Sequence, residues 1–203
     1  MKNYILNKLI IFIKTFYPNY TKEELATLKY GLEGIYITLT KTIIIFTIAY
    51  FLKIHKQLLF IIISYNFLRL FSFGMHSKNS ASCLLSSTFI FIGSVYLCQL
   101  IQFPFFVKIF VAFASIIIFI KYSPADTAKR PIINKKKRFI YKLVSTLTII
   151  LYSCLLLINK QNFISNALFL VMILQSFLIT PLCYSIFNQT YNNYLDWKGG
   201  KQC

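Results

Sequence analysis

The sequence predicts an all-α integral membrane protein with several membrane-spanning helices, and three observations lead to this prediction. Hydrophobic residues make up 57% of the 203 residues, and the mean hydropathy is +0.64. The apolar residues gather in long runs, most of them close to the roughly 20 residues that a helix needs to cross the hydrocarbon core. The charged residues lie mainly between these runs, because a charge at the bilayer centre is costly.

The first expected element is an amphipathic helix over residues 3–17. On a helical wheel its asparagines and lysines fall on one face, and its isoleucines, leucines and phenylalanines fall on the other. A helix of this kind lies in the membrane interface. Pro18 ends it, and Thr21 followed by Glu24 matches a capping box that opens a second short interfacial helix.

Six apolar segments follow, and each is predicted to form a membrane-spanning helix. They cover residues 34–52, 57–73, 84–103, 105–122, 139–158 and 163–187. If the N-terminus is cytoplasmic, 16 Lys and Arg residues lie inside and 4 lie outside. Because cytoplasmic loops carry an excess of Lys and Arg, we expect both termini in the cytoplasm.

The domain organisation expected from this pattern is one membrane-embedded domain over residues 1–203. Residues 1–33 form the interfacial helices, residues 34–187 form the six-span core, and residues 188–203 form a cytoplasmic tail. The expected location is therefore the cell membrane, with several crossings.

The charge balance limits the possible partners. The chain has 22 Lys and Arg against 5 Asp and Glu, a net charge of +17, which suits an anionic membrane surface or an acidic ligand. No nucleic-acid-binding module accompanies the basic runs, so no nucleic acid is expected. The five cysteines lack metal-ligand spacing and there are only two histidines, so we expect no metal and no cofactor.

The stretch FGMHSKNSASC, residues 73–83, places a histidine and a cysteine on the predicted cytoplasmic side. An imidazole can take the proton of a thiol and so create a nucleophile. On one continuous helix, His76 and Cys83 would be about 10 Å apart along the axis. Gly74 and the polar run that includes Ser80 make a turn or re-entrant loop plausible, and this bend would bring His76 to Cys83 at the start of the third span. The alternative is an ordinary polar loop.

Four further polar residues are candidates for supporting roles. Asn66 and Arg69 lie within the second predicted span, where polar residues are often functional, although Arg69 can also extend to the headgroups. Asp126, in SPADT, can orient an imidazole, bind a basic loop residue or cap a turn. Glu33, at the start of the first span, can have a buried partner or cap a helix.

Three motifs together resemble the accessory gene regulator B (AgrB) family of membrane cysteine endopeptidases. They are YGLEG before the first span, the run RLFSFGMHSKNSASCLLSS, and SPADTAKRPI followed by a lysine-rich run. The resemblance covers essentially the whole chain. One departure is FGMH, because many relatives have two glycines before the histidine.

This resemblance implies a substrate and a reaction. The substrate is an AgrD-like quorum-sensing pro-peptide with an amphipathic leader and an acidic C-terminal tail. Cys83 is the implied nucleophile and His76 the implied base, and the enzyme removes the tail through a thioester on Cys83 before ring closure to a thiolactone or lactone. A homodimer is also implied by the family.

The basic loop is a candidate for docking the acidic tail of the pro-peptide. Its members are Lys129, Arg130, Lys135, Lys136, Lys137 and Arg138. The alternative is that these charges only set the orientation of the protein in the membrane. A rival function for the whole chain is a small peptide or ion transporter without proteolytic activity, in which Asn66 and Arg69 line a path.

Overall fold

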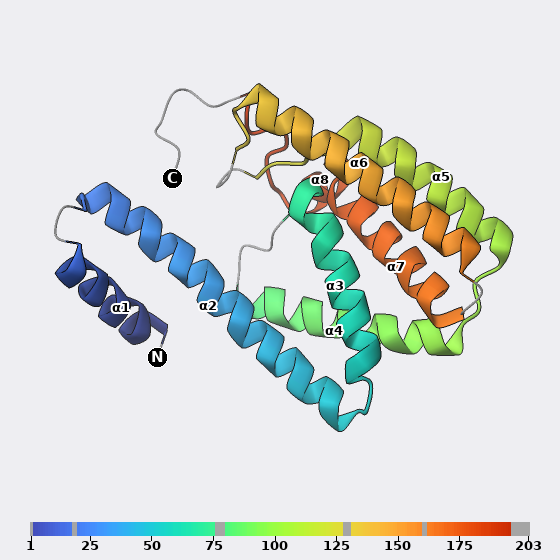
Figure 1. Cartoon of the computed structure of the whole chain (residues 1–203), viewed down its shortest axis with the longest axis horizontal. Coiled ribbons are helices and arrows are strands. Elements are labelled where there is room, and N and C mark those ends of the chain that lie inside the picture. Colours follow the sequence, from blue (N-terminus) through green and yellow to red (C-terminus); the bar gives the residue numbers. More distant parts are fainter. Residues whose placement is uncertain (1, 18–19, 76–79, 128–130, 160–161, 196–203) are drawn as a thin grey trace. The chain divides into compact units, whose positions relative to one another are not determined.

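The computed structural model describes residues 2–17, 20–75, 80–127, 131–159 and 162–195, and these are all-α with eight helices (Figure 1). The helices are α1 (Lys2–Phe16), α2 (Lys22–Phe51), α3 (His55–Ser72), α4 (Ser80–Leu100), α5 (Phe105–Tyr122), α6 (Lys135–Ile158), α7 (Asn162–Leu178) and α8 (Pro181–Ile186). They fall into two compact units, Met1–Leu52 and Lys53–Gln202.

The first unit consists of α1 and α2. The predicted capping box at the start of α2 is confirmed: the amide of Glu24 donates to Thr21 Oγ1, and the Thr21 amide donates to Glu24 Oε2 at 2.8 Å. The separate second helix and first span were predicted wrongly, because they form one continuous helix of 30 residues. Gly31 and Gly34 weaken a helix but do not break it.

The amphipathic helix predicted at the N-terminus is present as α1. It contacts α2, and Leu6 is buried there while the rings of Phe12 and Phe16 are 61% and 65% exposed. The Lys29 ammonium on α2 donates to Asn7 Oδ1 on α1 at 2.9 Å. Among the described side chains of α1, Leu6 is therefore the buried apolar one, and most of the others are exposed.

Within the described part of the chain, four helices are long and apolar enough to cross a membrane, which indicates a membrane protein. The qualifying stretches are Gly31–Phe51, Cys83–Leu100, Phe105–Tyr122 and Lys135–Ile158. The predicted span 57–73 is helical as α3, but its N-terminal turn is polar and it does not reach the same apolar content. The apolar part of α7, Phe163–Leu178, is shorter.

Two predicted boundaries need correction. The fifth span begins at Lys135 and not at residue 139. The side chain of Asn134 caps this helix, because its Oδ1 accepts hydrogen bonds from the amides of Lys136 and Lys137. The last predicted segment, 163–187, is two helices. Pro181 cannot donate a backbone hydrogen bond, so α7 ends at Leu178 and α8 begins at Pro181.

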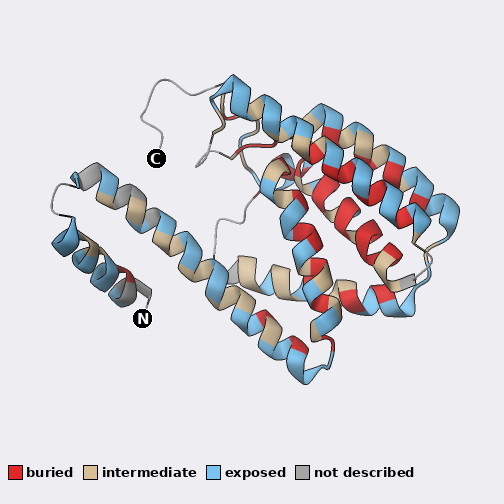
Figure 2. Ribbon diagram, viewed as in Figure 1, coloured by how far each residue is buried: buried red, intermediate tan, exposed pale blue. Residues whose placement is uncertain are grey.

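In the second unit, α7 is the central helix. It contacts α3, α4, α5, α6 and α8, and Figure 2 shows burial concentrated along it. Its buried positions include four polar residues, Ser165, Asn166, Gln175 and Ser176. Large apolar side chains on the outer helices point outward, as with Phe89 on α4 and Phe106 on α5, which are 84% and 82% exposed. Polar groups inside and apolar groups outside suit a lipid environment.

A buried polar cluster joins α5, α6 and α7 at one end of the unit. The Lys108 ammonium on α5 donates to Ser165 Oγ at 2.8 Å, and that hydroxyl donates to the Leu156 carbonyl at 3.0 Å. The side-chain amide of Asn166 donates to the carbonyls of Cys98 and Ile101, at and just beyond the end of α4. Helix ends leave such carbonyls without partners, so these contacts tie three helix termini to α7.

We expect Ser165→Ala to destabilise the protein more than Lys108→Met. The serine variant leaves a buried amino group without its acceptor, which costs about 1–3 kcal/mol of unfolding free energy, whereas methionine removes the charge and keeps the volume, at less than about 1.5 kcal/mol. Thermal unfolding in detergent micelles measures both. A larger loss for Lys108→Met would contradict this account.

Candidate functional site

The predicted break after the second span is present. Helix α3 ends at Ser72 and α4 begins at Ser80. Phe73 has a φ of 58° and Gly74 a φ of 113°, a backbone region that glycine adopts readily. A Cβ atom on Gly74 would also lie 3.1 Å from the carbonyl oxygen of Leu178. Both the backbone angle and the close approach of α7 therefore require glycine here.

The backbone of residues 72–75 is held by the chain around it. The Gly74 amide donates to the Ala125 carbonyl at 2.9 Å, and the Ala125 amide donates to the Ser72 carbonyl at 3.0 Å. The Met75 amide donates to the Leu178 carbonyl at 3.1 Å. Non-helical backbone near lipid persists only where protein groups satisfy it, and these bonds meet that need.

Two polar side chains fix the same segment. The Arg69 guanidinium donates to the Met75 carbonyl at 2.8 Å and to the Tyr65 hydroxyl. The Gln175 amide nitrogen donates to Ser72 Oγ at 2.6 Å and to the Phe73 carbonyl at 2.7 Å. Arg69 thus bonds within the protein. Gln175 was missed by sequence reasoning, although a glutamine inside an apolar helix was the available signal.

Cys83 lies in the first turn of α4, and its side chain is half-buried with a free thiol. The Tyr65 and Phe91 rings, 5.3 Å apart, join α3 to α4. His76 and the Ser80 side chain lie outside the described residues, so the predicted His76 to Cys83 contact stays a prediction.

The other described cysteines differ in their exposure. Cys98 and Cys183 are buried free thiols, and Cys154 is an exposed free thiol on α6. An exposed cysteine distant in sequence from the break serves as a useful control for Cys83.

Asp126 organises the loop between α5 and α6 and the segment after α8. Its buried carboxylate accepts the amides of Asn193 at 3.1 Å, Tyr194 at 3.0 Å and Ile132 at 3.4 Å. Burial raises the pKa of this carboxyl, and the amide donors and the nearby Arg138 oppose the rise. Of the three roles predicted for Asp126, these bonds from backbone amides agree best with the capping of a turn.

The basic residues predicted for docking do not form one uniform loop. Lys135, Lys136 and Lys137 are exposed in the first turn of α6. Arg138 is different, because its guanidinium carbon lies 3.5 Å from the centre of the Tyr194 ring and its Nη1 is buried without a partner among the described residues. Its contacts therefore differ from those of the three lysines, and its docking role stays a prediction. Lys129 and Arg130 lie outside the described residues.

The structure also describes the other two supporting candidates, Asn66 and Glu33. Asn66 is exposed on α3, and Glu33 is half-buried on α2 in the first unit. Within the described ranges, no group of three His, Cys, Asp or Glu residues is placed to hold a metal ion.

We expect Gln175→Leu to lower the unfolding free energy by about 1–3 kcal/mol, because the Phe73 carbonyl loses its side-chain donor. Thermal unfolding in micelles measures the change. Gln102→Leu is the matched control, since Gln102 is exposed in the connection before α5. Equal effects of the two substitutions would show that Gln175 does not hold the segment.

Comparisons with known proteins cover most of this chain. The profile of the family described as accessory gene regulator B matches residues 4–179. An AgrB-like protein of Clostridium acetobutylicum is 27% identical over 86% of this chain and 84% of its own length. An AgrB-like protein of Listeria innocua is 30% identical, covering 85% of each.

A third relative is the accessory gene regulator protein B of Staphylococcus aureus, which is 28% identical over 80% of this chain and 86% of its own length. No solved structure matches the chain. The family match extends over the N-terminal helix, the break at Gly74 and the helix that carries Cys83. The chain therefore belongs to the accessory gene regulator B family, which implies a role in the agr quorum-sensing system.

Proposed function

We propose that this protein is a membrane-embedded cysteine endopeptidase that processes an AgrD-like pro-peptide. The observation that carries the proposal is the position of Cys83: a half-buried free thiol in the first turn of α4, just after a break with a glycine at positive φ. His76 follows Met75 in the sequence. The backbone amide of Met75 donates to the Leu178 carbonyl, and its carbonyl accepts from Arg69. Family membership supports the same assignment.

In the proposed reaction, His76 takes the proton of Cys83 and the thiolate attacks the peptide carbonyl that precedes the acidic tail. The amide bond breaks, a thioester forms on Cys83, and the leaving amine takes the proton from His76. A cysteine or serine side chain of the substrate then attacks the thioester. Its proton passes to the Cys83 thiolate, and the peptide leaves as a thiolactone or lactone.

The membrane arrangement that suits this reaction has six spans. Helices α3 and α7, 18 and 17 residues long, each extend about 26 Å. Together with the four helices that are long and apolar enough to cross a membrane, they make six. Both termini and Cys83 then face the cytoplasm, where thiols stay reduced. The free apolar face of α1 lies in the membrane interface. We propose a homodimer as well, as the family resemblance implies.

The three exposed lysines at the start of α6 are proposed to attract the acidic tail of the substrate. Positive charge at a helix N-terminus is destabilising, because it is repelled by the positive end of the helix dipole. Three lysines at this position therefore suggest a functional role. Arg138 is left out of this docking set, because it packs on Tyr194.

We expect Cys83→Ala and His76→Ala each to reduce pro-peptide cleavage by at least about 10⁴-fold, because each removes one partner of the nucleophile. Purified protein is incubated with a candidate pro-peptide, and mass spectrometry follows the products and any adduct on Cys83. Cys154→Ala, which changes an exposed cysteine on α6, is the matched control. Normal cleavage by Cys83→Ala would exclude the proposal, and peptide transport by that variant in vesicles would favour the transporter.

Joint replacement of Lys135, Lys136 and Lys137 by glutamine should raise KM about tenfold with little change in kcat, since exposed ion pairs contribute up to about 1 kcal/mol each. The increase should shrink at high salt. Replacement of Lys53 and Lys56, also exposed, serves as the control. An unchanged KM, with the orientation intact by cysteine labelling, would mean that the lysines serve only topology.

A further inference from the structure

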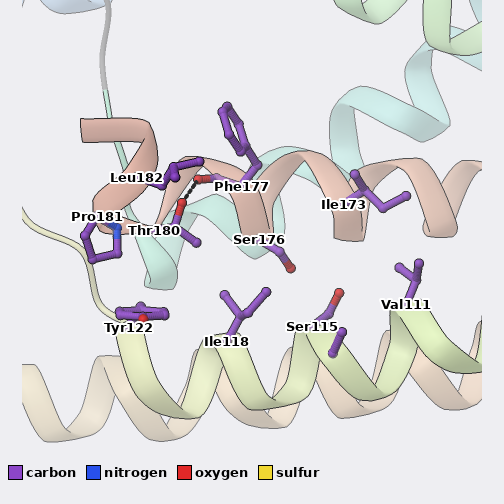
Figure 3. A pocket seen from close by; sticks show the side chains of 11 residues that line it. Val111, Ser115, Ile118, Tyr122, Ile173, Ser176, Phe177, Thr180, Pro181 and Leu182 are labelled. Atoms are coloured by element: carbon purple, nitrogen blue, oxygen red, sulfur yellow. Dashed lines mark hydrogen bonds between the residues drawn. The ribbon is translucent and has the colours of Figure 1, made fainter. Parts of the chain in front are cut away.

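An apolar groove runs between α5 and the junction of α7 with α8 (Figure 3). Its volume is about 450 Å³. Along α5 its lining extends from Val111 to Tyr122, which corresponds to about 16 Å of helix. This length is about half of the roughly 30 Å hydrocarbon core. The groove therefore has the length of one acyl chain within one leaflet.

The groove contains a buried hydroxyl group that lacks a partner. Ser176 on α7 is 5% exposed, and its Oγ makes no hydrogen bond among the described residues. Figure 3 shows its side chain directed toward α5, opposite Ser115 and Ile118. A buried hydroxyl without a partner is unfavourable. An occupant that brings a hydrogen-bond acceptor to this depth would remove that cost.

A cation stands at one end of the groove. Tyr122 lines that end, and the exposed Lys121 ammonium lies 5.2 Å from the centre of the Tyr122 ring. The apolar lining, the unpartnered hydroxyl and the terminal ammonium thus follow one another along α5. Ser176 lies opposite residues that precede Tyr122 by one to two helical turns.

We propose that this groove binds one anionic phospholipid. One acyl chain lies against Val111, Ile118 and Ile173, the ester carbonyl accepts a hydrogen bond from Ser176, and the phosphate pairs with Lys121. The order of these groups along a phospholipid is the order of the three features along α5. Basic sites between membrane helices are known to bind anionic headgroups. The inference stands whether or not the proposed peptidase activity is correct.

The features argue against a helix as the occupant. The backbone carbonyls of a helix already accept one hydrogen bond within it, so a second copy of this chain packed in the groove would offer Ser176 only a shared backbone acceptor. Packing of a second copy in the groove would also not in itself bring an anionic group to Lys121. A neutral phospholipid would fill the groove and reach Ser176, but it would lack the net negative charge.

The test uses full-length protein reconstituted in vesicles of equal phosphatidylglycerol and phosphatidylcholine and then extracted with mild detergent. Native mass spectrometry counts the lipids that stay bound. We expect one retained phosphatidylglycerol in preference to phosphatidylcholine. Lys121→Gln should lower its retention about fivefold, Lys121→Arg should keep it, and Ala114→Phe, which fills the groove, should abolish it.

Lys142→Gln is the matched control, because Lys142 is an exposed lysine on α6 that does not line the groove. Equal retention by Lys121→Gln and Lys142→Gln would overturn the proposal, as would equal retention of the two lipids by the unaltered protein. A dimer without lipid that Ala114→Phe dissociates would identify a second copy as the occupant and also overturn it. Lys121 is exposed, so its variants keep the test decisive even if Ala114→Phe does not fold.

Discussion

The packing of the second unit depends on hydrogen bonds to the backbone of Ser72 to Met75, where α3 ends and the chain is no longer helical. Among apolar surroundings an unpaired amide or carbonyl costs several kcal/mol. The loop at Ala125 and the end of α7 supply partners, and the side chains of Arg69 and Gln175 supply two more. The glycine allows α7 to come close enough for this.

This constraint explains why α7, although it is largely apolar, buries several polar side chains. A helix at the centre of a membrane bundle faces protein and not lipid, so it can hold polar side chains. Ser165, Asn166 and Gln175 hydrogen-bond to groups at the ends of neighbouring helices. The outer helices show the complementary pattern, with large apolar side chains exposed. A distinct role falls to Asp126, which joins the loop after α5 to the segment after α8.

Several elements follow from local sequence patterns. The limits of α5 agree with the prediction, because Pro104 precedes a long apolar run and polar residues follow it. The capping box at Thr21 and the break at Gly74 rest on short-range chemistry, and both are present. Two boundaries were missed. Glycine is a weak helix former but does not always end a helix, so the continuity of α2 could not be predicted. A single proline within an apolar run likewise did not show that the last segment divides at Pro181.

The sequence by itself determined the membrane class, the helical content and the position of Cys83 near a forced bend, because hydrophobic length, glycine and proline act locally. Only the tertiary structure decided which polar groups meet. Gln175 and Phe73 are about a hundred positions apart, and Asp126 and Tyr194 nearly seventy. Their hydrogen bonds depend on how the helices pack around α7. The tertiary structure also separated Arg138, stacked on Tyr194, from the three exposed lysines beside it, since burial depends on neighbours that no local pattern specifies.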